Sequence, residues 1–309
     1  MGSVTEQMCA TVLVGIAVGE ERMGVAVRDA GRGLDAERWA PTDAPAAAAV
    51  LLADLLREHD VARDRIAGAG AALSGDAQRR ARDAADLSAA LDLDVRADRA
   101  LHAAALGEWS EGTARGAQLA VLVRLDDRIE VAIVSDGRIF SGAHGGAGEL
   151  GHVLVDPAGA LCRCGNRGCL ETYVSSGALC EQLLRSHGPL GIEQVLALSA
   201  AGDRGCRRVL HDAGRHVGRA LAGLCNAIDP DVVVLGGTLA AAGDVLLEPV
   251  RTAIAQHTVP GAAMRVEVTT SALGERAELL GALALAASPP PPPAYAGATG
   301  AATTRRREG

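Results

Sequence analysis

One short window, residues 151–172 (GHVLVDPAGALCRCGNRGCLET), contains one histidine and three of the seven cysteines, and a metal that they bind together would constrain the fold of this chain strongly. In that window His152 is followed by Cys162, Cys164 and Cys169, at spacings that are typical of metal sites. One imidazole and three thiolates form a closed tetrahedral ligand set that suits Zn²⁺. Because four protein ligands leave no open coordination position, we expect the zinc ion to be structural.

The alternative interpretation is a chance cluster of buried cysteines. Against it, Gly165 and Gly168 stand where the chain must turn tightly, which gives the uncommon pattern C-x-C-G-x-x-G-C. The chain has seven cysteines, and this odd number fits reduced thiols in a cytoplasmic protein better than a disulfide framework. The other four have mostly apolar neighbours and are interpreted as small buried side chains: Cys9, Cys180, Cys206 and Cys225.

The rest of the chain alternates between β-rich and helical segments. We expect β-rich runs over residues 10–18, 24–29, 65–75, 93–98, 117–127, 128–142 and 264–271, and helices over 44–60, 76–93, 102–112, 176–188, 214–229 and 275–287. Residues 229–257 fit a strand, a glycine turn and a helix. This pattern predicts a mixed α/β architecture rather than a purely doubly wound sheet. Residues 288–309, rich in Pro, Ala and Arg, predict a disordered tail.

Charge and composition exclude several classes of function. The formal net charge is −8, which argues against broad binding to nucleic acid or to an anionic membrane. Aromatic residues make up only 2% of the chain, too few for a base-stacking surface. We find neither an apolar run of membrane-spanning length nor a secretory signal. We therefore expect a cytoplasmic protein that contacts neither nucleic acid nor a membrane directly.

Several motifs resemble the ROK family, which groups bacterial sugar kinases with sugar-responsive repressors. The string AGELGHVLVDPAGALCRCGNRGCLE (147–171) resembles the family signature, and DGRIFSGAHGGAGELGH (136–152) resembles the lead-in to its sugar site. Residues 218–250 resemble its long helix and the glycine turn beside its adenosine pocket, and residues 273–286 resemble its last helix. The resemblance is close over residues 120–287 and weaker over 10–110.

The resemblance implies an α/β, actin-like (ribonuclease H-like) two-domain sugar-kinase fold with a zinc-binding loop at residues 152–169. It implies a smaller N-terminal α/β domain over 10–100, completed by a C-terminal helix over 275–287, and a larger α/β domain over 101–274. Family repressors place a helix-turn-helix ahead of this fold. Since residues 1–9 are too few to form one, we expect no DNA-binding domain.

Site residues also follow from the resemblance. It implies that Glu149, His152 and Glu171 contact sugar hydroxyls. Carboxylates accept strong hydrogen bonds from hydroxyls. A zinc-bound imidazole keeps its second ring nitrogen for a ligand or for a neighbouring group. It also implies that the turn Gly236, Gly237 and Thr238 borders the adenosine of ATP. Such a turn serves plain strand-to-helix packing as well, so the turn alone does not establish ATP binding.

The chain departs from a kinase of this family at its phosphate-binding turns. The family's first phosphate loop carries an aspartate, a glycine pair, a threonine and a basic residue, whereas residues 17–22 read AVGEER. The second loop should be of the type T-G-x-G-x-G, whereas residues 127–132 read DRIEVA. Carboxylates in place of glycines disfavour a phosphate cradle. The segment between the LSG turn and the base strand is also too short and too helical to supply the family's polar, tryptophan-containing sugar loop.

The position of the general base is altered too. Family kinases carry an Asn-Asp pair before an A-A-L-G-E helix, and here the pair falls on Arg99 and Ala100. Alanine cannot accept a proton from the attacking hydroxyl. Asp98 could act as the catalytic base only if the chain slips locally, and otherwise it is a strand-end or helix-capping carboxylate.

These departures favour a non-catalytic ROK-type protein, a regulatory module that binds zinc and senses a sugar or another small molecule. Its partners would be a sugar-like ligand, another regulator protein and a second copy in a homodimer. The alternative is an ATP-dependent kinase of a hexose, amino sugar or cyclitol with an atypical active site, and only this alternative requires ATP and Mg²⁺. A third possibility is a vestigial protein without a ligand.

Overall fold

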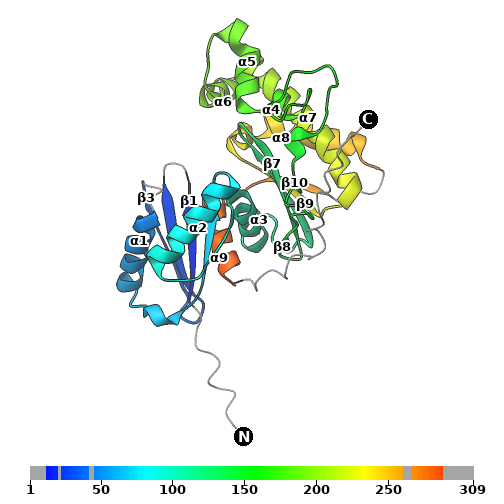
Figure 1. Ribbon diagram of the computed structural model, residues 1–309. Helices are drawn as coiled ribbons and strands as arrows, with labels where there is room; N and C mark the ends of the chain where they lie inside the picture. Colours follow the sequence, from blue (N-terminus) through cyan, green and yellow to red (C-terminus); the bar gives the residue numbers. More distant parts are fainter. Residues whose placement is uncertain (1–11, 20–21, 42–44, 260–265, 288–309) are drawn as a thin grey trace, which may run out of the picture.

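The computed structural model describes residues 12–19, 22–41, 45–259 and 266–287, which form two five-stranded sheets with helices around and between them (Figure 1). The first sheet has the order β3-β2-β1-β4-β5. Its strands are β1 (Val12–Val18), β2 (Met23–Asp29), β3 (Leu34–Ala40), β4 (Ile66–Leu73) and β5 (Val95–Arg99). β1 pairs antiparallel with β2 and parallel with β4, and β3 extends the antiparallel side. The sheet is therefore mixed, as the sequence predicts.

The second sheet has the order β10-β9-β6-β7-β8. Its strands are β6 (Leu119–Leu125), β7 (Ile129–Ser135), β8 (Arg138–Ile139), β9 (Val232–Gly236) and β10 (Glu267–Thr270). β6 pairs antiparallel with β7 and parallel with β9. Both faces of β6 are buried, because Val121 and Val123 belong to one core cluster and Ala120 and Leu122 to another. Such a sheet needs helices on both sides.

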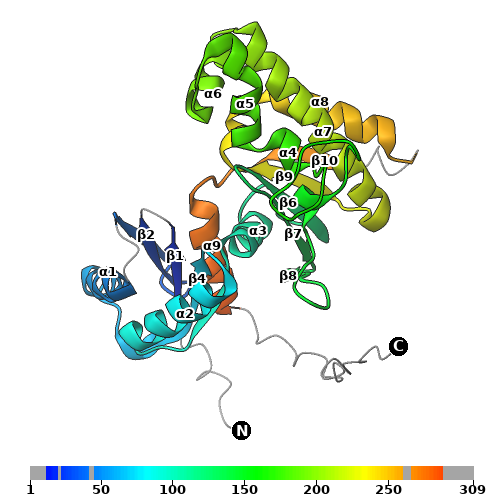
Figure 2. The ribbon, with the colours of Figure 1, turned by 45° about the horizontal axis from the view of Figure 1, so that its top comes forward.

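Two helices lie between the sheets (Figure 2). α9 (Arg276–Ala287) packs on β1 and β4 of the first sheet, and α3 (Ala100–Ser110) packs on β6 and β7 of the second. The two helices pack against each other through glycines. A Cβ atom on Gly281 would overlap the carbonyl oxygen of Ala103, and one on Gly107 would overlap that of Ala277. This close contact joins the two halves of the molecule.

The outer faces of the sheets are covered by the remaining helices. α1 (Pro45–Glu58) and α2 (Ala77–Leu91), with the short turn η2 (Arg63–Arg65), cover the first sheet. The second sheet carries α4 (Glu171–Val174), α5 (Ser176–His187), α6 (Ile192–Ala200), α7 (Arg204–Ile228) and α8 (Asp244–His257), with the turns η3 (Leu150–His152) and η4 (Thr238–Ala242). α7 buries one apolar stripe against this sheet and packs along α8. None of the described helices is long and apolar enough to cross a membrane.

Three segments differ from the sequence-based expectation. No strand is predicted from the sequence between residues 29 and 44, yet Leu34–Ala40 form the strand β3. The helix α6 was not predicted, and α7 begins at Arg204 rather than near residue 214. The expected tail at 288–309 and Cys9 lie outside the described residues. Of the other cysteines expected to be buried, Cys206 and Cys225 are buried and Cys180 is half-buried.

Candidate ligand-binding cleft and metal centre

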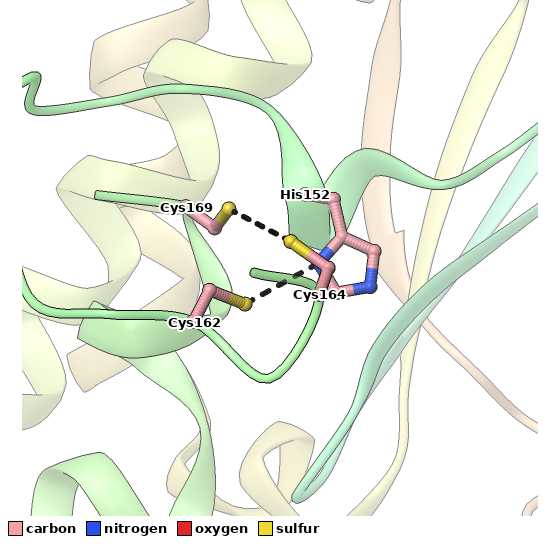
Figure 3. Close-up of side chains that lie close together, drawn as sticks. All are labelled: His152, Cys162, Cys164 and Cys169. Carbon is pink, nitrogen blue, oxygen red and sulfur yellow. Dashed lines mark hydrogen bonds between the residues drawn. The ribbon is translucent and has the colours of Figure 1, made fainter. Parts of the chain in front are cut away.

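The four predicted metal ligands converge in the structure (Figure 3). His152 ends the turn η3, and the loop that follows returns the three cysteines to it before α4 begins. Backbone bridges between Leu154 and Cys169 and between Leu161 and Arg167 hold the loop together. The four ligand atoms all lie within 4.8 Å of one another.

The distances between these atoms fit a tetrahedral zinc ion. Cys162 Sγ is 3.5 Å from His152 Nδ1, and Cys164 Sγ is 3.6 Å from Cys169 Sγ. With Zn–S and Zn–N bonds of about 2.3 and 2.0 Å, the edges of a tetrahedral site are about 3.5–3.8 Å long. Burial raises the pKa of the Cys169 thiol to about 12, whereas the backbone N–H of Asn166 lowers that of Cys164. A bound Zn²⁺ would deprotonate a coordinating thiol.

Glycines permit the tight path of the loop, as the sequence predicts. Gly165 and Gly168 have φ values of +90° and +64°, in the left-handed region that favours glycine. A Cβ atom on Gly168 would also overlap the carbonyl oxygen of Asp156. Tyr173 Oη donates a hydrogen bond of 2.8 Å to Asp156 Oδ2, which lowers the pKa of that carboxyl. The loop is therefore braced against α4.

His152 connects this metal centre to the cleft between the sheets. Its Nδ1 faces the thiols, and its Nε2 lies 3.9 Å from Glu149 Oε2. Glu149 keeps a side chain that is 54% exposed and lines a cavity of about 550 Å³. The structure thus brings together two of the three residues predicted to contact a sugar.

The third residue, Glu171, is held differently. It is buried, and Arg163 donates to both of its oxygens, from Nε to Oε1 at 2.5 Å and from Nη2 to Oε2 at 3.0 Å. Ile129 N donates to Oε2 at 3.2 Å. Burial alone would raise the pKa of Glu171, but these hydrogen bonds hold it below its ordinary value. Because both oxygens accept internal hydrogen bonds, Glu171 connects the metal-binding loop to β7.

The cavity beside Glu149 lies between the two halves of the molecule. Its walls come from the end of β4 and the following turn, from the start of α3, and from the β6–β7 hairpin: Leu73, Ser74, Gly75, Asp76, Arg80, Arg99, Ala100, Leu101, Arg124, Arg128, Glu130 and Glu149. Within this lining the guanidinium of Arg99 pairs with Glu130 at 2.6 Å. More than half of the lining residues are charged.

Ala100, on which the sequence analysis places the family's general base, is one of the residues that line this cavity. Asp98 stands at the end of β5, where its Oδ1 accepts a hydrogen bond of 2.7 Å from Arg99 N and lies 2.8 Å from Nδ1 of the buried His102. These contacts join the end of β5 to the first turn of α3. They are the contacts expected of a strand-end carboxylate.

The two turns that would bind phosphate in a kinase are hairpin turns here. Gly19 N donates to Arg22 O at 3.0 Å across the β1–β2 turn, and Glu20 and Glu21 lie outside the described residues. In the second hairpin Leu125 pairs with Ile129, so the turn is limited to residues 126–128 and residues 129–132 belong to β7. A glycine-rich cradle is absent from the described part of both turns.

The predicted adenosine turn is present as a structural element. Gly236 and Gly237 line a cavity of about 210 Å³ with Arg22, Trp39 and Arg124. Thr238 N donates to Asp126 Oδ1 at 2.5 Å, which fixes the turn to the β6–β7 hairpin. Gly237 has a φ of +83°. The geometry serves packing between β9 and η4 and leaves a small cavity beside it.

Sequence reasoning missed two arginines that form ion pairs around the candidate site. Arg124 on β6 pairs with Glu278 on α9 at 2.7 Å, and Arg163 was not singled out at all. The position of Arg163 between two predicted ligands was a signal that its side chain must lie close to the metal centre. Arg124 and Glu278 are 154 residues apart, and nothing in the sequence pattern joins them.

The two mixed sheets, the helix pair between them and the cysteine loop define an α/β protein with the actin-like fold of sugar kinases. The ROK family model matches residues 80–288, so the chain belongs to the ROK family. The fold class and the family resemblance predicted from the sequence are confirmed.

Curated relatives include both kinases and regulators. The chain is 34% identical over 205 residues to a glucokinase of Halalkalibacterium halodurans, and the aligned region covers 61% of this chain and 62% of that protein. It is 32% identical over 191 residues to the DNA-binding transcriptional dual regulator NagC of Escherichia coli, over 59% of this chain and 47% of that protein. The matched part of the chain thus spans about three fifths of the glucokinase and about half of the regulator.

Solved structures share the fold over most of the chain. A ROK hexokinase from Thermus thermophilus aligns with a TM-score of 0.75 at 29% identity, covering 90% of this chain and 98% of that chain. A ROK family transcriptional regulator, a homolog of the Escherichia coli MLC protein, aligns with a TM-score of 0.74 at 23% identity, covering 89% and 77%. The second likeness establishes the fold alone.

Proposed function

We propose that this protein is a non-catalytic ROK module that binds a hydroxyl-rich small molecule in the cleft beside Glu149 and does not transfer phosphate. The observation that carries the proposal is Ala100, which lines the cleft at the position of the family's general base. A methyl group cannot accept the proton of an attacking hydroxyl, and general base catalysis typically contributes about 10²–10⁴ in rate.

The contacts of Asp98 support this proposal. Its Oδ1 is held by His102 and the Arg99 amide, and Asp98 is not among the residues that line the cavity beside Glu149. Arg99 itself pairs across the cleft with Glu130. The space beside Ala100 is therefore bordered by an ion pair instead of a base.

The turns around the cleft provide a second argument. Phosphoryl transfer depends on groups that stabilise charge on the transferred phosphate. In the β6–β7 hairpin, Arg128, Glu130 and Ala132 stand where the family's loop has its glycines. In the cavity beside Gly237, Glu275 and Glu278 hold the nearby arginines, since Arg22 pairs with Glu275 at 2.6 Å and Arg124 with Glu278 at 2.7 Å.

We further propose that His152, Cys162, Cys164 and Cys169 hold a structural zinc ion, which the donor set and the distances support. The ion would supply a rigid tetrahedral junction and no chemistry on a substrate, because all four positions are filled. In the protein it would fix the ring of His152, and hence the edge of the cleft that Glu149 borders. The two-domain division, a homodimer, a regulator protein as partner and a cytoplasmic location belong to the same proposal.

A second candidate function is an ATP-dependent sugar kinase. It is favoured by the glucokinase relative and by the Thermus thermophilus hexokinase, which this chain covers almost completely. Gly236 and Gly237 would then border ATP, Mg²⁺ would accompany the nucleotide, and Asp98 would act as the base. This function requires a local rearrangement that turns Asp98 toward the cavity, whose lining does not include it.

Calorimetric titration of the zinc-loaded protein with hexoses, amino sugars, cyclitols and their acidic or phosphorylated derivatives tests the proposed binding function. We expect at least one compound to bind, and Glu149→Gln to weaken it about tenfold because a charged acceptor is lost. Glu267→Gln, at an exposed site on β10, is the matched control and should bind like the parent protein. Equal affinity of the Glu149 variant and the control would refute the assignment of the site.

A further inference from the structure

The cavity beside Glu149 is lined by four guanidinium groups and by the carboxyl groups of Asp76, Glu130 and Glu149. Arg80, Arg99, Arg124 and Arg128 all border the cavity of about 550 Å³. Arg80 comes from α2 and Arg99 from the end of β5, whereas Arg124 and Arg128 come from the β6–β7 hairpin. Arginines from both halves of the molecule therefore meet in one cavity.

The arginines differ in their partners. Arg99 pairs with Glu130 at 2.6 Å, and the two side chains are only 23% and 25% exposed. Arg124 pairs with Glu278 on α9, and Arg80 donates to the Gly75 carbonyl. Among the residues that the structure describes, neither Arg80 nor Arg128 makes an ion pair. The cavity thus contains two cations without a carboxylate partner and one cation, Arg99, whose partner is a carboxylate within the same cavity.

Guanidinium groups donate hydrogen bonds and accept none, so they match anionic oxygens better than neutral hydroxyls. The carboxylate of Glu149 shows the opposite preference, because it accepts hydrogen bonds from hydroxyls. Both types of group border the same cavity. A ligand that satisfies both must carry hydroxyls and an anionic group.

We propose that the ligand of this cleft is an anionic, hydroxyl-rich small molecule, either a sugar phosphate or a sugar acid. Its hydroxyls bind Glu149, and its phosphate or carboxylate replaces Glu130 as the partner of Arg99 and reaches Arg128. The inference rests on the proposed binding function and narrows it. In the free protein, Glu130 acts as an internal competitor that occupies Arg99 until the ligand binds.

Titration calorimetry of the zinc-loaded protein with glucose, glucose 6-phosphate, glucuronate and inorganic phosphate tests this inference. We expect glucose 6-phosphate or glucuronate to bind at least tenfold more tightly than glucose, and inorganic phosphate alone to bind weakly. If glucose 6-phosphate binds more tightly than glucuronate, the anionic group of the ligand is a phosphate; if glucuronate binds more tightly, it is a carboxylate. Replacing the glucose scaffold by N-acetylglucosamine and its 6-phosphate repeats the comparison on an amino sugar.

Variants identify the groups responsible. Arg99→Gln should raise the dissociation constant of the anionic compound about tenfold while leaving that of the neutral sugar unchanged, a difference that a general folding defect would not produce. Glu130→Gln removes the internal competitor and should lower the dissociation constant. Arg138→Gln, at an exposed position on β8, serves as the control and should have no effect.

Glucose binding as tight as that of both anionic derivatives would overturn the inference and leave the proposed binding function intact. Inorganic phosphate binding as tightly as glucose 6-phosphate would also overturn it, since hydroxyls would then contribute nothing. If neither the neutral nor the anionic members of both sugar series bind to the zinc-loaded protein, the inference and the proposed function fail together.

Discussion

At the scale of single residues, Arg163 links the cysteine loop to the second sheet through Glu171. It lies between two of the predicted zinc ligands and gives two hydrogen bonds to Glu171, whose side chain is only 7% exposed. Arg163→Gln should lower the free energy of unfolding by about 1–3 kcal/mol, because it leaves a buried carboxylate short of donors. Urea denaturation measures this loss. In the double variant Arg163→Gln/Glu171→Gln, where no buried charge remains, most of the stability should return; a double variant as unstable as the sum of the singles would contradict this account.

The cysteines differ in their expected effect on metal content. Cys164→Ser removes one of four ligands, so we expect zinc to fall from about one ion per chain to nearly none and the unfolding midpoint to fall with it. Cys180→Ser, on α5 outside the cluster, should keep its zinc. Elemental analysis of both purified variants decides the point. A full zinc complement in the Cys164 variant would show that the ligand set is wrong.

The part of the candidate site whose residues lie close together in the sequence could be predicted. The spacing of His152 and the three cysteines was enough to place four ligands together, and Gly168 marked the turn that this requires. The pairing of Arg99 with Glu130 could not be foreseen, because it depends on how the β6–β7 hairpin faces the end of β5. Contacts of that kind are set by the tertiary fold and leave no periodic signal.

At the scale of secondary-structure elements, the contact between α3 and α9 should be highly sensitive to side-chain size. Gly281 of α9 lies directly against the Ala103 carbonyl of α3. Gly281→Ala should therefore destabilise the protein by about 1–3 kcal/mol through overpacking. Gly223→Ala is a matched control in the helix α7, where an added Cβ meets nothing within 4 Å, and it should stabilise by up to about 1 kcal/mol through helix propensity. Equal effects of the two variants in thermal unfolding would refute the tight helix contact.

Most elements followed from apolar patterning, and the exceptions have physical reasons. The strand β3 lies at the edge of its sheet and alternates between exposed and half-buried residues, so its sequence LDAERWA lacks the apolar run of a buried strand. The first turns of α7 carry Arg204, Arg207 and Arg208 on exposed positions, which conceals the buried Cys206 and Leu210. Tertiary packing, rather than local propensity, determines these segments.

At the scale of the whole molecule, two ion pairs join the halves on either side of the cleft. Arg99 of the first sheet pairs with Glu130 of the second, and Arg124 of the second pairs with Glu278 of α9, which packs on the first. The cleft between them keeps an acceptor for hydroxyls at Glu149 and has alanine at the family's base position. This arrangement is the basis of the proposal that the molecule holds a ligand between its halves without activating a hydroxyl for attack on ATP.

The most direct test of this account is an assay of phosphate transfer from Mg·ATP by the zinc-loaded protein, in which mass spectrometry detects phosphorylated products from a panel of hexoses, amino sugars and cyclitols. We predict no product above the level of a reaction without protein, because Ala100 cannot act as a base. A phosphorylated sugar that forms with the parent protein and disappears with Asp98→Asn would contradict the central claim and establish a kinase.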